Sequence, residues 1–355
     1  MRPFDDTVTP ERRRPGPAEA GLIFSLLAVL QLYAGNLPFL TGLSDPLRIL
    51  LSEALLIALP PLVFSALRRY PVVAAFRLRP PRLRDAALVL LIAPVATLTA
   101  FSAGLLAIVA VKALFGTLNI PGGVGDVLSR GMPVAVATIG LVPAVCEELM
   151  FRGFLQRGME AFGARRAVVL SGLMFGLFHF DFQRLAAQML LGLVIAYVVY
   201  RSGSLLNGML LHFLHNAGSV LLTGLAAPMA ARGGVAAAGF VWLAGSASGD
   251  VFASPLFLEY AERMGVSVDT LMGALAAGSG VLLVCGLLVL AGLMVWFRHV
   301  TRDVPHPPAA GTAPARTFLT AVPGLALILA VYAAIALGLA GHPAANDLVR
   351  LLGLG

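Results

Sequence analysis

Residues 132–155 read MPVAVATIGLVPAVCEELMFRGFL, and this stretch decides the fold class of the chain. It is apolar over a length that crosses a bilayer, because about 20 helical residues at ~1.5 Å each span a hydrocarbon core of ~30 Å. Three ionisable residues nevertheless lie inside it, namely Glu147, Glu148 and Arg152. A charged residue at the centre of a membrane helix costs about 2.5–3.5 kcal/mol on insertion scales. We therefore expect these residues to carry the function of the chain.

The composition of the whole chain is that of a membrane protein. Of its 355 residues, 59% are hydrophobic and 12% are charged, and the mean hydropathy is +0.89. Soluble domains carry about 25% charged residues. The charges here lie between apolar runs of about 20 residues, which is the length of a membrane-spanning helix. The sequence therefore predicts an all-α, polytopic transmembrane helix bundle.

About nine spans are predicted from the lengths of the apolar runs and from the charges that flank them. They cover residues 20–42, 46–67, 85–115, 132–158, 166–181, 186–201, 204–225, 270–298 and 317–341.

The arginines indicate how the bundle is oriented. If every predicted span crosses the membrane, seventeen arginines of the N-terminal tail and alternate loops fall on one side and six fall on the other. By the positive-inside rule, the arginine-rich side and the N-terminus are cytoplasmic. A net charge of +7 alone is compatible with nucleic-acid binding, but this distribution of the arginines argues against it. Only one basic residue is a lysine, an arginine bias typical of a GC-rich genome, so we expect a bacterial cytoplasmic (inner) membrane.

The chain divides into five predicted regions. Residues 1–19 form a cytoplasmic tail and residues 20–129 the N-terminal membrane helices. Residues 130–226 form a membrane core that carries most of the polar residues within spans. Residues 227–269 are expected to be extracytoplasmic or re-entrant, and residues 270–355 to hold two C-terminal membrane helices with a Pro/Ala-rich linker.

Polar residues of three predicted spans reach a similar depth. His179 lies in one further span, and His212 and Asn216 share a helix face in another. Counted at about 1.5 Å per residue from the arginine-rich side, Glu147 lies roughly 15 Å deep and His179 about 20 Å. On the same basis, His212 lies about 12 Å deep and Asn216 about 18 Å. Because isolated polar groups in lipid are unsatisfied, we expect the four to converge on one cavity.

These residue types allow two kinds of chemistry. The chain has no HExxH and no GxSxG motif, so the usual zinc-peptidase and serine-hydrolase signatures are missing. A carboxylate and an imidazole can activate water, while a second imidazole and an amide can stabilise an oxyanion. One glutamate and two histidines can instead bind a zinc ion.

Three of the polar residues also have purely structural interpretations. Glu148 and Arg152, four residues apart on a helix, can form a structural ion pair. His215 can serve as a hydrogen-bonding residue between helices.

Three short motifs occur in order along the core. Residues 147–152 (EELMFR) match EExxxR, residues 175–179 (FGLFH) match FxxxH, and residues 212–216 (HFLHN) match HxxxN. In this order they resemble the CPBP family of intramembrane glutamic endopeptidases, which are related to the CAAX prenyl proteases and are also called the bacteriocin-processing or abortive-infection-like family.

The resemblance implies a role for each matching residue. Glu147 would activate water together with His179, and His212 and Asn216 would form the oxyanion hole. Glu148, Arg152 and Phe175 would support them. No metal or other cofactor is implied. The implied substrate is a membrane-anchored protein or peptide within the lipid bilayer. His215 is an additional imidazole for which the motifs have no role.

Two other functions remain open on the sequence. The polar cavity can bind a peptide without cutting it, as in an immunity factor or a chaperone-like membrane protein. Buried glutamate and histidine residues also occur in proton-coupled transporters, although the chain shows no inverted repeat or pair of broken helices.

Overall fold

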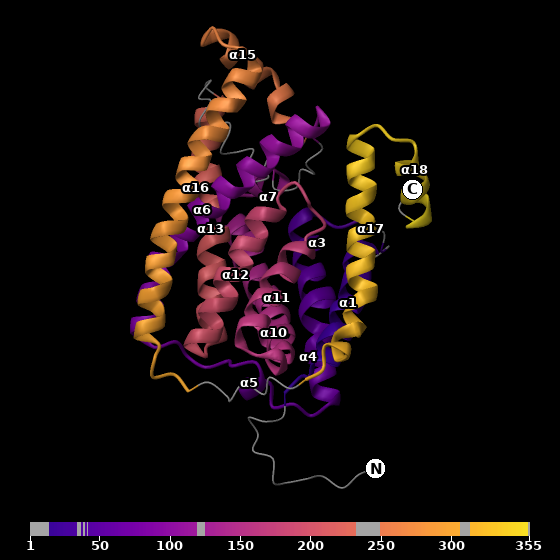
Figure 1. The fold of residues 1–355 in the computed structure, drawn as a ribbon, viewed down its shortest axis with the longest axis vertical. Coiled ribbons are helices and arrows are strands. Elements are labelled where there is room, and N and C mark those ends of the chain that lie inside the picture. The colour runs from indigo at the N-terminus through magenta and orange to yellow at the C-terminus, as the bar shows by residue number, and fades with distance from the viewer. Residues whose placement is uncertain are drawn as a thin grey trace.

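The computed structural model describes residues 14–33, 37, 40, 42–118, 125–231, 249–305 and 313–353. In these ranges the chain is helical and forms no β-strand, which confirms the all-α fold class. Figure 1 shows a bundle whose long helices run roughly parallel to one axis.

The described residues form a series of helical elements along the chain. They are α1 (Pro17–Tyr33), α3 (Asp45–Leu51), η3 (Ser52–Ala58), α4 (Leu59–Leu67), α5 (Val72–Ala75), α6 (Leu83–Phe115), α7 (Gly125–Ser129), α8 (Met132–Ala135), η4 (Val136–Leu141), α9 (Val142–Glu148), η5 (Leu149–Leu155), α10 (Gln156–Met159), η6 (Glu160–Phe162), α11 (Ala164–Leu177), α12 (Leu185–Ser202), α13 (Leu205–Ala231), η7 (Val251–Ala253), α15 (Pro255–Arg263), α16 (Val268–Val300), η8 (Ala315–Ala321), α17 (Val322–Leu339) and α18 (Ala344–Leu351).

Seven continuous helical segments of the described chain are long and apolar enough to cross a membrane. They are Asp45–Leu67, Leu83–Phe115, Met132–Phe162, Leu185–Ser202, Leu205–Ala226, Val268–Val300 and Ala315–Leu339. Each coincides with one of the nine predicted spans. The other two predicted spans, 20–42 and 166–181, correspond to α1 and α11, which have 17 and 14 residues. Both are shorter than the ~20 residues of a full crossing.

The arginine-rich connections gather at one end of the bundle. In Figure 1, α5 and the chain that leaves α16 lie at the lower end, whereas α15 and α18 lie at the upper end. Segments that are far apart in the sequence contact one another at this lower end. For example, Arg201 Nη2 at the end of α12 donates to the carbonyl of Thr301 after α16 at 3.1 Å. The assignment of this end to the cytoplasm remains a prediction.

Two spans contain π-helical turns. In η3 and η4 the turns end with bonds that reach back five residues, from Leu59 N–H to Ala54 O and from Val142 N–H to Ala137 O. Prolines follow directly in both cases, at Pro60 and Pro143. A proline has no N–H to donate, so the regular α-helical ladder is interrupted there. A third π-helical segment, η5, directly follows Glu148.

Helices α11 and α12 form a tightly packed antiparallel hairpin. A Cβ added to Gly192 would lie 2.7 Å from the carbonyl oxygen of Gly172, and one added to Gly176 would lie 2.9 Å from the backbone nitrogen of Met189. Small residues thus allow the two backbones to approach closely, as in other membrane helix pairs. The tip of this hairpin presents His179 to the interior.

The end of α11 corrects the prediction that residues 166–181 form one continuous helix. The helix ends at Leu177, and Phe180 has a left-handed backbone with φ of 53°. His179 therefore lies in the turn and not on the helix. About 14 residues at ~1.5 Å rise account for only ~21 Å, so α11 ends inside the thickness of a bilayer.

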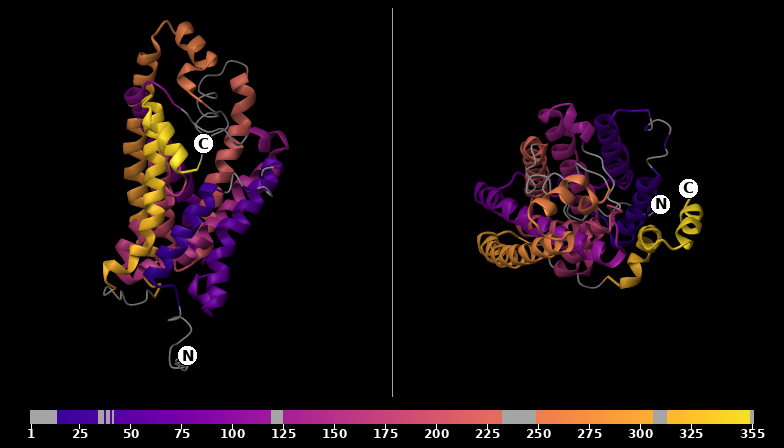
Figure 2. Two further views of the ribbon diagram at one scale, coloured as in Figure 1. Left: turned by 90° about the vertical axis from the view of Figure 1, so that its right-hand side faces the viewer. Right: turned by 90° about the horizontal axis from the view of Figure 1, so that it is seen from above.

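The C-terminal helices pack on the outside of the core. Helix α16 packs along α6, and α17 packs against α1, which Figure 1 and Figure 2 show on opposite sides of the molecule. Phe252, Phe257 and Met272 form a small apolar cluster over the end of α6. Of the predicted extracytoplasmic or re-entrant segment, residues 227–269, the part at 232–248 lies outside the described residues.

Candidate active site

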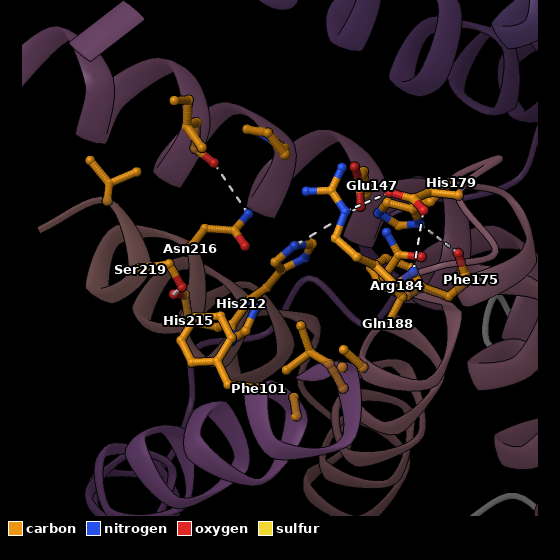
Figure 3. A pocket seen from close by; sticks show the side chains of 18 of the residues that line it. Phe101, Glu147, Phe175, His179, Arg184, Gln188, His212, His215, Asn216 and Ser219 are labelled. Carbon is orange, nitrogen blue, oxygen red and sulfur yellow. Dashed lines mark hydrogen bonds and ion pairs between the residues drawn. The ribbon is translucent and has the colours of Figure 1, made fainter. Parts of the chain in front are cut away.

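A cavity of about 430 Å³ lies between α6, α9, the α11–α12 turn, α12 and α13. The shared cavity that the matched depths predict is therefore present, because Glu147, His179, His212 and Asn216 all line it. In the view of Figure 3, the His212 ring lies between Glu147 and Asn216.

Glu147 is the carboxylate that faces this cavity. Its side chain is 15% exposed, and its Oε2 has no hydrogen-bond partner among the described residues. That atom lies 3.9 Å from Nε2 of His212. A buried carboxylate oxygen without a protein partner is costly unless it binds water or a ligand. Glu147 thus has an acceptor available for a reacting molecule.

Glu148 has a different environment, although it is the next residue. Its side chain is fully buried, and Oε1 accepts hydrogen bonds from Arg152 Nη1 at 2.7 Å and from His212 Nδ1 at 3.0 Å. The structural ion pair with Arg152 is therefore present, and it extends to a cavity residue. The two glutamates separate because consecutive residues on a helix point about 100° apart.

Arg152 is held on several sides. Its Nη2 donates to the carbonyl of Gly192 at 2.9 Å, and its guanidinium carbon lies 4.4 Å from the centre of the Phe175 ring. This geometry permits a cation–π interaction, which is stronger at a desolvated site than at an exposed one. Phe175, expected to be a supporting residue, thus packs against Arg152 and also contacts the His212 ring edge-on.

His179 has its ring orientation fixed by its own helix. Nδ1 lies 2.8 Å from the carbonyl oxygen of Phe175, one of the carbonyls left without a partner where α11 ends. A carbonyl can only accept, so Nδ1 carries the hydrogen and donates it. In the neutral imidazole, Nε2 is then an acceptor. His179 is therefore set up to accept a proton or a hydrogen bond in the cavity.

Asn216 compensates for a proline on a neighbouring helix. Its Nδ2 donates to the carbonyl of Ile139 at 3.2 Å. Ile139 is four residues before Pro143, which has no N–H to donate to that carbonyl. This bond fixes the side-chain amide at the cavity wall and leaves a second N–H of the same group for another acceptor.

His215 also lines the cavity, which the motifs do not predict. Its Nδ1 lies 3.0 Å from Oγ1 of Thr97 on α6, and its ring is 5.9 Å from that of Phe101. The bond to Thr97 agrees with a role in helix–helix hydrogen bonding.

Sequence reasoning missed Glu53 on η3. The helix that carries it packs against α9. Its Oε2 is buried without a hydrogen-bond partner among the described residues, and Glu53 does not line the cavity. The signal was available, since Glu53 is a carboxylate within the predicted span 46–67, as Glu147 is within its own.

Sequence reasoning also missed two residues at the tip of the α11–α12 hairpin. Asp181 accepts hydrogen bonds from Arg184 Nε at 2.5 Å and from the backbone N–H groups of Gln183 and Arg184. This local Asx-type turn starts α12 and brings Arg184 to the cavity wall. Turn residues of this kind are difficult to place without the fold.

The zinc alternative requires three donors around one point. Within the described ranges, no group of three or more histidine, cysteine, aspartate or glutamate side chains is placed to hold a metal ion.

Comparison with known proteins finds a similar family over part of the chain. Residues 129–218 match the family model described as Type II CAAX prenyl endopeptidase Rce1-like. Neither the curated proteins nor the solved structures contain a match to the chain. The matched segment runs from just before α8 into α13 and carries the motifs at 147–152, 175–179 and 212–216. The resemblance to the CAAX prenyl protease family is thus confirmed for residues 129–218, which do not include the α6 part of the cavity wall.

Proposed function

We propose that this chain is an intramembrane endopeptidase that hydrolyses a peptide bond of a membrane-associated protein or peptide. The observation that carries the proposal is the placement of Glu147, His179, His212 and Asn216 around one cavity. The match of residues 129–218 to a family of prenyl endopeptidases supports the same activity.

In the proposed reaction, Glu147 and His179 activate one water molecule. The water oxygen attacks the carbonyl carbon of the scissile bond while its proton passes to the Glu147 carboxylate. Nε2 of His179, which the bond from Nδ1 to Phe175 leaves available, accepts a hydrogen bond from the second O–H of the same water and so orients it. This hydrogen stays on the oxygen that becomes part of the product acid. The tetrahedral intermediate then loses the amine, and the proton held by Glu147 goes to the leaving nitrogen.

His212 and Asn216 are proposed to stabilise the oxyanion of that intermediate. Nδ1 of His212 is bound to Glu148, so Nε2 is the ring nitrogen on the side of Glu147 and, when protonated, donates to the oxyanion. Asn216 contributes the amide N–H that its bond to Ile139 leaves unused. Oxyanion donors held in place before the reaction typically contribute about 10²–10³ in rate.

The substrate is proposed to enter as an extended peptide. A cavity of about 430 Å³ accommodates a few residues around the scissile bond, in the size range of about 300–1,000 Å³ seen for ligand sites. The position of the cavity among membrane-spanning helices favours a chain segment that is itself anchored at the membrane.

The test is cleavage by the purified full-length chain reconstituted in vesicles. The substrates are a set of fluorogenic peptides that carry a C-terminal lipid anchor. We expect Glu147→Gln to lower the rate by about 10²–10⁴-fold, the usual contribution of a general base. Glu53→Gln is the matched control, because it makes the same change on a neighbouring helix outside the cavity. We expect its rate to stay within about tenfold of the parent chain.

The remaining functions predict other results in the same assay. A peptide-binding protein would retain the peptide without cutting it, both in the parent chain and in Glu147→Gln. A transporter would move protons across the vesicle membrane without cleavage. The zinc alternative predicts loss of cleavage with a chelator and recovery with zinc, whereas the proposed mechanism predicts no change.

A further inference from the structure

A second cavity, of about 470 Å³, lies at the arginine-rich end of the bundle. Four arginines line it, namely Arg77, Arg79, Arg82 and Arg157. Among the described residues, Asp303 is the one acidic side chain in its wall. The cavity is separate from the candidate active site, and the two share no lining residue.

Two of the lining arginines, Arg77 and Arg157, belong to a cluster of charged side chains in which positive charges outnumber negative ones. Glu160 accepts bonds from Arg14 Nη1 at 2.7 Å and from Arg77 Nη1 at 2.7 Å, and it also pairs with Arg157. Three guanidinium groups thus surround one carboxylate. Arg77 and Arg157 are only 8% and 5% exposed, so water screens this excess charge poorly. A buried excess of positive charge favours binding of an anion.

The acidic residues nearby do not remove this excess. Arg82 and Arg84 donate to Asp303 and lower its pKa to about 2, so Asp303 is a carboxylate at neutral pH. Asp85 accepts two bonds from Arg82. These two arginines and two aspartates balance one another. The surplus positive charge therefore remains with the cluster around Glu160.

Hydrogen bonds from the start of α13 hold the backbone of the segment that carries Arg77 and Arg79. Arg77 has a left-handed conformation with φ of 56°, and its carbonyl accepts from the N–H of Leu205 at 2.9 Å. Ser204 Oγ donates to the carbonyl of Arg79 at 2.6 Å. The start of α13 thus holds the segment that carries both arginines. A non-glycine residue in this conformation persists where its surroundings determine it, often at a binding site.

We propose that this cavity binds a phosphate-bearing anion, and specifically the headgroup of an anionic phospholipid. Guanidinium groups match phosphate oxygens with paired hydrogen bonds. The cavity lies where α12 ends, α13 begins and the chain leaves α16, which is the level of the lipid headgroups if these helices span a bilayer. Basic pockets between membrane helices are the usual place for such binding. The proposal is independent of whether the chain cuts peptides.

The experiment uses the purified full-length chain in neutral detergent micelles. Phosphatidylglycerol, phosphatidylcholine and inorganic phosphate are titrated separately, and bound lipid and thermal stability are measured. We expect phosphatidylglycerol to bind and to raise the melting temperature, and the other two probes to do neither. Equal effects of phosphatidylglycerol and phosphatidylcholine would overturn the proposal. An equal effect of inorganic phosphate would overturn the assignment to lipid.

Two variants test the cavity itself. Arg79→Gln removes one exposed lining charge, and Ala74→Trp fills the cavity without changing any charge. We expect each to weaken phosphatidylglycerol binding by at least about fivefold, as the loss of a charge-assisted bond or of space would. Arg165→Gln is the matched control, because Arg165 is exposed and does not line the cavity. Unchanged binding in both cavity variants, or equal loss in the control, would contradict the proposal.

Discussion

Nδ1 of His212 donates to Oε1 of Glu148 at 3.0 Å, so the second glutamate of the pair, and not the first, orients this imidazole. Glu147 lies 3.9 Å from the other ring nitrogen. The two adjacent carboxylates therefore contact opposite sides of one ring. In the proposed mechanism, Glu147 acts on the substrate, while Glu148 positions the group that stabilises the oxyanion.

The first prediction concerns the buried pair of Glu148 and Arg152. Replacing only Glu148, as in Glu148→Leu, leaves the Arg152 guanidinium buried without its carboxylate. Removal of one partner of a buried ion pair typically costs about 3–5 kcal/mol. We expect a clear drop in the melting temperature in micelles, together with loss of cleavage, because His212 also loses its acceptor.

The double variant Glu148→Leu with Arg152→Met separates stability from activity. Replacing both charges by apolar groups is often close to neutral for stability. We therefore expect much of the melting temperature to return while cleavage stays lost. If cleavage also returned, Glu148 would have no role in positioning His212.

The second prediction concerns Asn216. Asn216→Leu removes the proposed oxyanion donor and leaves the Ile139 carbonyl without the donor that Pro143 cannot provide. We expect kcat to fall by about 10²–10³-fold, with a smaller change in KM. Loss of the hydrogen bond to the Ile139 carbonyl adds a loss of about 0.5–1.5 kcal/mol in stability. A variant that loses stability but keeps kcat would show that Asn216 only caps the interrupted helix.

The third prediction concerns the close contact of α11 and α12. A Cβ in Gly192→Ala would lie 2.7 Å from the carbonyl oxygen of Gly172, so the helices must separate. Phe175 and His179 lie on this hairpin, and we expect cleavage and stability both to fall. Gly292→Ala is the control, since an added Cβ there meets nothing within 4 Å. Equal effects of the two substitutions would contradict the steric explanation.

The helical fold and the convergence of the polar residues were predictable from the sequence. Apolar length and arginine placement locate helices because a bilayer allows few alternatives to them. The depth of Glu147 and His212 follows from helix rise alone. These inferences need no knowledge of which helix packs against which.

The partners of each side chain were not predictable in this way. The pairing of His212 with Glu148 depends on the rotation of α13 relative to α9, which an almost uniformly apolar sequence leaves undetermined. The end of α11 at Leu177 was also missed, because FGLFHF has no glycine or proline after the helix to mark its end. Glu53, in contrast, was overlooked despite a readable signal.

The last prediction concerns Tyr332 on α17, outside the segment that matches the family model. Its hydroxyl donates to the carbonyl of Leu177 at 3.0 Å, at the end of the helix that precedes His179. Tyr332→Phe removes this bond, and we expect a loss of about 0.5–1.5 kcal/mol in stability and a several-fold loss in kcat. Tyr33→Phe is the matched control, because the Tyr33 hydroxyl donates to the Leu352 carbonyl at 2.6 Å, in the C-terminal segment. We expect the control to lower stability by a similar amount without changing kcat. Equal kinetic effects in the two variants would mean that α17 does not act through the hairpin that carries His179.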